Sequence, residues 1–184
     1  MELTANVVKE CVNMMNDPQV GGVIIPERSV GTSFWVKVRD YERSFYSNTE
    51  IESARFFRRD LVKRVNGFEE DIVFFEESTL PQKIENLGFN VRKRINAEIL
   101  HHEENFSIRK WLKKKFYYGK SVSKYREKFD KYASKQISIL HRLSIFLKNK
   151  RFYSKPPLAL GVLILKFLEY FSVSLGFLAN TIGE

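Results

Sequence analysis

The segment DIVFFEESTLPQKIENLGFNV (71–91) sets the fold class. Its apolar start predicts a strand. Two adjacent acids, Glu76 and Glu77, follow this run, and a helix is predicted from Leu80 to Leu87. Gly88 ends that helix, because glycine readily adopts the left-handed conformation that closes a helix. A strand that leads directly into a helix is the unit from which α/β folds are built.

The rest of the N-terminal part repeats this alternation, which predicts an α/β fold with a mixed sheet. Thr4 is a suitable N-cap for a helix, and an Asn-Gly pair suits a sharp turn because both residues tolerate positive φ. The predicted elements are a helix over 5–16, a buried strand over 20–27, a loop leading to a helix over 31–46, a strand over 54–57 followed by a short helix, a turn at 66–67, and one or two strands over 89–102.

Length and composition place the chain among globular proteins with an anionic partner. Its 184 residues fit one domain, and 43% hydrophobic with 29% charged residues excludes a disordered chain. The net charge of +9 favours nucleic acid, phospholipid or a phosphorylated substrate. The single cysteine, Cys11, excludes an intramolecular disulfide framework, and its apolar neighbours indicate a core position.

Composition also divides the chain into three predicted zones. Residues 1–105 carry the alternating helices and strands. Residues 106–155 are basic, with eleven Lys or Arg between Arg109 and Lys135. Residues 156–184 are apolar and predict a helix that associates with a membrane or packs on a partner.

Several segments resemble, in order and spacing, the acceptor-side half of a family-2 glycosyltransferase of the type A, nucleotide-sugar-dependent fold. The matching segments are GGVIIPE (21–27), FWVKVRDYER (34–43), SARFFRRDL (53–61), VNGFEE (65–70), FEESTLPQKIENLGF (75–89), ILHHEENFSIRKWLKKKFYYGKS (99–121) and KYREK (124–128). The resemblance implies a partial type A sheet with helices, followed by C-terminal helices, and the activity of a hexosyltransferase or a truncated relative.

By this resemblance, Glu77 takes the position of the general base and Glu76 that of the acid before it. The base removes the proton of an acceptor hydroxyl while that oxygen attacks the anomeric carbon of the sugar with inversion. The family pattern has Asp where Glu77 stands, and Ser78 and Thr79 also depart from it. The open alternative is that both acids only favour the N-terminal turn of the helix through its dipole.

Further candidates follow from the same resemblance. Trp35, Glu42 and Arg43 are expected on the loop that covers the acceptor, where Trp35 would stack on a sugar. Arg43 and Arg55 would hold a diphosphate through bidentate guanidinium groups. A core position for Trp35, and structural pairs of the arginines with Glu42 or Glu52, are the alternatives.

His101 and Glu103 are the candidate metal ligands, because the family often places a His-x-Glu near its metal. Neighbouring histidines on a strand point to opposite faces, so at most one of His101 and His102 faces a site. The alternative is a loop with two solvated histidines.

The resemblance also implies a missing part. Complete family members end their nucleotide-binding half with Asp-x-Asp, whose carboxylates hold Mg²⁺ or Mn²⁺ on the diphosphate. The 184 residues contain no Asp-x-Asp, and MELTANVVKECV (1–12) matches the stretch that follows this motif. We therefore expect nucleotide-sugar transfer to need a separate or missing nucleotide-binding half. The alternative is a catalytically inactive binding or scaffold module.

The basic zone predicts an amphipathic helix with a stripe at positions 108, 111, 112, 115, 116 and 119, interrupted only by Lys115. Such a helix is typical of a membrane surface. Lys and Arg interleaved with aromatic residues also suit nucleic acid, which ranks second, and a solvated face is the plain alternative.

The C-terminal helix has a small or polar stripe that includes Lys166 and Glu169, one turn apart and able to pair. These ions favour a helix that lies in the membrane interface or packs on a partner over one that spans the bilayer. The basic zone and the apolar helix together predict a protein on the cytoplasmic face of the cell membrane. The resemblance adds that its acceptor would be a lipid-linked or cell-surface glycan. Uncovered sheet edges in a half-domain predict self-association.

Overall fold

Helices and strands are interspersed as far as His102 in the computed structural model, and helices follow. The structure describes residues 1–183, with side chains for all of them except 130–132, 182 and 183. The described chain divides into two units. Unit 1 contains Met1–Arg28, Ser47–Glu70 and Phe75–His102, and unit 2 contains Ser29–Tyr46, Asp71–Phe74 and the chain from Glu103 onward. The prediction of an α/β fold with a mixed sheet is confirmed in this general form.

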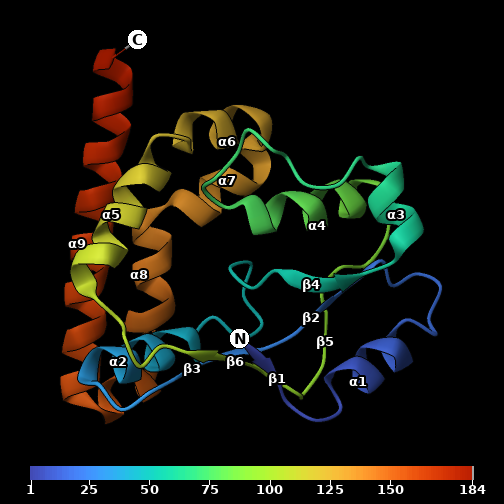
Figure 1. Cartoon of the computed structure of the whole chain (residues 1–184), viewed down its shortest axis with the longest axis horizontal. Helices are drawn as coiled ribbons and strands as arrows, with labels where there is room; N and C mark the ends of the chain where they lie inside the picture. The colour runs from blue at the N-terminus through green and yellow to red at the C-terminus, as the bar shows by residue number, and fades with distance from the viewer. Residues whose placement is uncertain (184) are drawn as a thin grey trace. The chain divides into compact units, whose positions relative to one another are not determined.

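Unit 1 combines short strands with helices (Figure 1). Its elements are β1 (Glu2–Leu3), α1 (Val7–Met14), β2 (Gly22–Ile24), β4 (Ala54–Phe57), α3 (Arg59–Arg64), α4 (Glu76–Asn86), β5 (Lys93–Arg94) and β6 (Ile99–His102). β2 lies between β4, which is antiparallel to it, and β5, which is parallel. The other sheet has the order β1-β6-β3, and β3 (Glu27–Val30) is the strand along which the chain leaves unit 1.

The predicted buried strand is confirmed in β2, whose successive side chains enter opposite cores. Val23 packs with Val7 and Cys11, which confirms the core position of that cysteine. Ile24 packs on the other side with Leu80 and Ile84 of α4. The alternation follows from the period of two in a strand, so β2 forms the centre of unit 1.

The helix starts in unit 1 differ from the predicted ones. The N-cap of α1 is Asn6 rather than Thr4, whose hydroxyl donates to the backbone oxygen of Glu98 at 3.0 Å. α4 begins at Glu76 rather than Leu80, because Phe75 turns the chain with φ 62° and ψ 24°. The helix ends as predicted, with Gly88 at φ 92°.

The apolar run before the two acids is a turn and not the predicted strand. Ile72 is buried, and the backbone nitrogen of Phe74 donates to the hydroxyl of Ser121 at 3.0 Å. Asp71 pairs with Lys128 at 3.0 Å. The run therefore docks on the basic helical region of unit 2 instead of joining a sheet.

Unit 2 is built mainly from helices (Figure 1). They are α2 (Phe34–Arg43), α5 (Ile108–Gly119), α6 (Val122–Lys128), α7 (Asp130–Ile137), α8 (Ile139–Leu147), a 3-10 turn (Lys150–Ser154) and α9 (Pro156–Gly183). α9 is the long red helix of Figure 1, and α5 lies beside it. Val38, Tyr41 and Phe45 pack with Phe146, Phe152 and Leu165 to form the core.

Candidate functional site

The two acids lie in the first turn of α4, as the resemblance implies. Glu76 is exposed and Glu77 is half-buried. Phe75, directly before them, has left-handed backbone angles, which are uncommon for residues other than glycine and especially for bulky ones. Strained backbone of this kind concentrates at functional sites. The turn is fixed by a bond from the hydroxyl of Thr79 to the backbone oxygen of Glu76 at 2.8 Å.

A hydrogen bond ties this helix start to the entrance of β4. The hydroxyls of Ser78 and Ser53 lie 2.9 Å apart. Ser53 stands two residues before Arg55, and residues two apart on an extended chain point to the same side. The helix start that carries Glu77 is thus joined to the strand that carries Arg55.

Arg55 and His101 meet at one carboxylate that the sequence analysis did not single out. Nη2 of Arg55 lies 2.7 Å from Oε1 of Glu27, and Nε2 of His101 lies 3.4 Å from Oε2 of the same residue. All three side chains are partly exposed, with 36% for Arg55, 21% for Glu27 and 20% for His101. The only signal in the sequence is that Glu27 ends the predicted strand segment GGVIIPE.

The predicted metal ligands have different partners. Both oxygens of Glu103 accept from the guanidinium group of Arg39, at 2.9 and 2.8 Å. His101 contacts Glu27, whereas His102 contacts Glu2 at 2.8 Å, so the two histidines do diverge as predicted. Among the residues with described side chains, no three His, Cys, Asp or Glu form a metal-binding group. The donors present do not fit a divalent metal, because the Glu103 carboxylate is already neutralised by Arg39.

Trp35, Glu42 and Arg43 lie on the helix α2 and not on a loop, which corrects the prediction. Ser33 caps this helix by accepting from the backbone nitrogen of Val36 at 3.3 Å. Trp35 is partly buried against the core of unit 2, as in its alternative interpretation. The expected sites therefore divide: Arg55, Glu76, Glu77 and His101 belong to unit 1, and Trp35, Glu42, Arg43 and Glu103 to unit 2.

Glu42 belongs to a buried ion cluster on α9. Lys166 of α9 lies 2.5 Å from both Glu42 and Glu169, which confirms that Lys166 and Glu169 pair. Glu169 also pairs with Lys115 of α5. The interruption of the α5 stripe at Lys115 thus has a structural cause. The polar stripe of α9 is matched by partners within unit 2.

The pKa values in this cluster follow from its burial and its charges. Burial alone would raise the pKa of Glu169, but Lys115 and Lys166 outweigh it and hold that pKa below its usual range. Lys166 in turn lowers the pKa of Glu42 against the effect of burial. Burial opposes the charge of Lys166, yet Glu169 and Glu42 raise its pKa well above the usual value. Glu42, Lys166 and Glu169 are therefore ionised at neutral pH.

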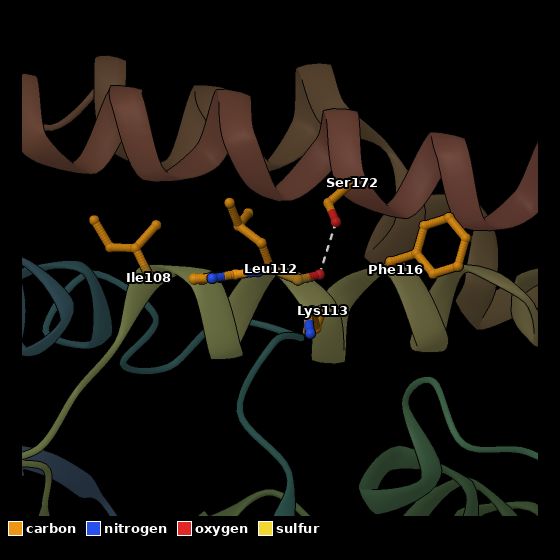
Figure 2. Close-up of a pocket in the computed structure, with 6 residues that line it drawn as sticks. Ile108, Leu112, Lys113, Phe116 and Ser172 are labelled. Carbon is orange, nitrogen blue, oxygen red and sulfur yellow. Dashed lines mark hydrogen bonds between the residues drawn. The ribbon is translucent and has the colours of Figure 1, made fainter.

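A groove of about 600 Å³ opens between α5 and α9 (Figure 2). The groove is lined by the apolar residues Ile108, Leu112 and Phe116 and by Arg109, Lys113 and Ser172, and most of its exposed surface comes from apolar atoms. The hydroxyl of Ser172 donates to the backbone oxygen of Leu112 at 2.7 Å, which is the dashed line in Figure 2. Gly176 and Gly119 let the two helices approach closely above this bond, because their positions leave no room for a side chain.

No family model, no curated protein and no solved structure matches the chain. The resemblance to family-2 glycosyltransferases therefore stays a prediction that depends on the motifs. Within the described residues, α9 is long and apolar enough over Pro156–Thr181 to cross a membrane, by length and composition only.

Proposed function

We propose that the chain is the acceptor-side part of a membrane-associated glycosyltransferase. It would help transfer a sugar, with inversion, from a nucleotide sugar to a lipid-linked or cell-surface glycan on the cytoplasmic face of the cell membrane. The proposal combines the motif resemblance with one structural observation. The α4 start with Glu77 is tied through Ser78 and Ser53 to β4, where Arg55 meets Glu27 and His101.

The residues on these elements can carry out one half of a transfer reaction. Glu77 accepts the proton of the acceptor hydroxyl while the hydroxyl oxygen bonds to the anomeric carbon. The bond from that carbon to the nucleoside diphosphate breaks, and the diphosphate takes the electron pair. Fixing the carboxylate matters, because a displacement of about 1 Å can cost roughly a hundredfold in rate. The strained turn at Phe75 and the Ser78–Ser53 bond provide that fixation.

The donor half of the reaction is assigned to another polypeptide segment. Mg²⁺ or Mn²⁺ and the nucleotide sugar need a carboxylate motif of the Asp-x-Asp kind, and the 184 residues contain none. His101 and Glu103 do not replace it, since Glu103 is held by Arg39. A nucleotide-binding partner chain is therefore part of the proposal.

Genetic complementation in the source cell tests this function without knowledge of the sugar. We expect loss of the chain to remove one sugar from a glycolipid or surface glycan, as read by mass spectrometry of cell extracts. The wild-type chain should restore that mass, and Glu77→Gln should not, because an amide cannot accept the proton.

Glu85→Gln is the matched control, since Glu85 lies on the same helix and pairs with Arg92 at 3.8 Å. It should restore the glycan fully. An unchanged glycan profile after loss of the chain would refute the proposed function. Equal amounts of the Glu77→Gln and wild-type proteins in the cell, measured by immunoblot, exclude a folding defect.

The second candidate is a catalytically inactive binding or scaffold module at the membrane. Its favouring observation is that Arg55 and Glu103 are already engaged in ion pairs, which weakens them as ligands for a diphosphate or a metal. Restoration of the glycan by Glu77→Gln would support this module and contradict the catalytic assignment.

A further inference from the structure

One side of α9 carries a continuous apolar stripe that unit 2 leaves uncovered. Its members recur every three or four residues, which is the spacing of one helix face. Phe167 is 69% exposed and Phe171 57%, and their rings stack with 6.4 Å between centroids. The stripe consists of Leu160, Ile164, Phe167, Phe171, Leu175 and Leu178. Large apolar surfaces of this kind mark an interaction site.

The groove between α5 and α9 lies beside this stripe. Ser172 lines the groove, and Leu175 of the stripe follows it by three residues, so the two share neighbouring positions on α9. On α5, Arg109 and Lys113 line the same groove and are exposed, one turn apart. The helix pair thus presents an apolar stripe, an apolar groove and two cations on one side.

The opposite side of the pair is occupied by the chain itself. Lys115 of α5 pairs with Glu169 of α9, and Lys166 pairs with Glu42 of α2. Lys115 and Lys166 thus form ion pairs inside unit 2, whereas Arg109 and Lys113 lie at the rim of the groove. The charges of the rim and the apolar stripe therefore act together on an external partner.

We propose that this α5–α9 surface docks on a bilayer that contains anionic phospholipid. The α9 stripe enters among the acyl chains, an acyl chain follows the groove along Leu112 and Phe116, and Arg109 and Lys113 pair with headgroup phosphates. Aromatic and aliphatic faces flanked by cations are the composition of helices that lie in the membrane interface. The inference gives the membrane part of the proposed function a surface and a lipid class, and it rests on that part alone.

Charge complementarity selects anionic phospholipid among the occupants. Nucleic acid would meet the cations but not the apolar stripe, which offers it no polar partner. A second copy of the chain would cover the stripe, but its net charge of +9 makes it a poorer match for Arg109 and Lys113 than an anionic surface. A bilayer surface with anionic headgroups satisfies both features at once.

Vesicle flotation with the full chain tests the proposal. Vesicles of phosphatidylcholine alone are compared with vesicles in which phosphatidylglycerol replaces part of it. Each cation near an anionic surface contributes about 1 kcal/mol, so the paired change Arg109→Gln and Lys113→Gln should weaken binding to the anionic vesicles about thirtyfold. Phe167→Ser with Phe171→Ser should abolish binding to both kinds of vesicle, with an unchanged circular dichroism spectrum.

Arg59→Gln with Lys63→Gln is the matched control, because these exposed cations have the same spacing on α3 of unit 1. This variant should bind like the wild type. Equal binding by the groove and control variants would overturn the proposal. Displacement of the chain from vesicles by soluble glycerol phosphate would also overturn it, since that result would indicate a phosphate site. An oligonucleotide that binds the chain in a gel shift and outcompetes the vesicles would overturn it as well. If light scattering shows a dimer and this dimer does not bind vesicles, the stripe would be assigned to a contact with a second copy.

The outcome is separate from that of the sugar-transfer test. Flotation measures lipid binding by the α5–α9 surface, and the glycan profile measures the chemistry assigned to Glu77. A chain that binds vesicles but leaves the glycan unchanged keeps the docking surface and loses the catalytic assignment.

Discussion

Lys166 of α9 lies 2.5 Å from Glu42 of α2, and both side chains are buried. Lys166 comes from the apolar helix and Glu42 from a segment more than a hundred residues earlier in the chain. The pair fixes which side of α9 faces the protein. Several properties of the chain depend on it and can be measured.

Removing the cation should destabilise unit 2. Lys166→Met leaves the carboxylates of Glu42 and Glu169 buried with less compensation, and breaking a buried pair in this way costs about 3–5 kcal/mol. Urea unfolding followed by circular dichroism measures the loss. Lys63→Met, at an exposed position of α3, should change the free energy of unfolding by less than about 0.5 kcal/mol. Adding Glu42→Gln to Lys166→Met should recover part of the loss, and a loss equal to that of the control would contradict the role of the cluster.

The same cluster predicts acid sensitivity. The pKa values of Glu42 and Glu169 are lowered in the folded chain, so these groups stabilise it at pH values above the ordinary carboxyl value of 4.5. Their contribution is lost as the pH falls from 4.5 towards the folded-state values. The free energy of unfolding should therefore decline below pH 4.5, and this decline should be smaller in Glu42→Gln.

Asp71→Asn is the comparison for that pH series. A hydrogen bond from Lys128 lowers the pKa of Asp71, but the pair is exposed to solvent, where ion pairs contribute little. Its stability profile should follow that of the wild type. A Glu42→Gln profile that coincides with both would show that the buried cluster does not control acid unfolding.

Gly176→Ala should weaken the contact between α5 and α9. A Cβ atom at Gly176 would overlap the backbone oxygen of Phe116, and overpacking of this kind costs about 1–3 kcal/mol. An alanine in a helix is otherwise favoured over glycine by about 1 kcal/mol, so any net loss reports the close approach. Thermal unfolding measures the effect, with exposed Ser174→Ala on the same helix as control. A raised unfolding temperature for Gly176→Ala would contradict the close packing.

The sequence predicted the elements that depend on local signals. The strand at 54–57, the turn at Asn66 and Gly67, and the helix end at Gly88 all follow from local signals: two aromatic residues in the strand, and asparagine and glycine in the turn and at the helix end. The prediction of a strand over the apolar run 71–75 was wrong, because the backbone of this run hydrogen-bonds to Ser121, far away in the sequence. Nothing in a local pattern identifies such a partner.

The same limit explains the candidate site. The sequence did not identify Glu27 as a site residue, because its role depends on its contacts with Arg55 and His101, which form only in the folded chain. Lys115 looked like an interruption of an apolar stripe until Glu169 supplied its partner. Hydropathy identifies an amphipathic helix, but the role of each charge on it is decided by the element that packs there.

The closed ion cluster also decides how α9 can behave at a lipid boundary. Its charges are neutralised by α2 and α5, so the helix can touch acyl chains with its outer side and keep every ion pair inside the protein. Arriving at a bilayer and leaving it again then needs no refolding and no proton transfer. If the α5–α9 surface binds a bilayer as proposed, unit 2 should exchange between membrane and solution without unfolding, at a rate set by the lipid composition it meets.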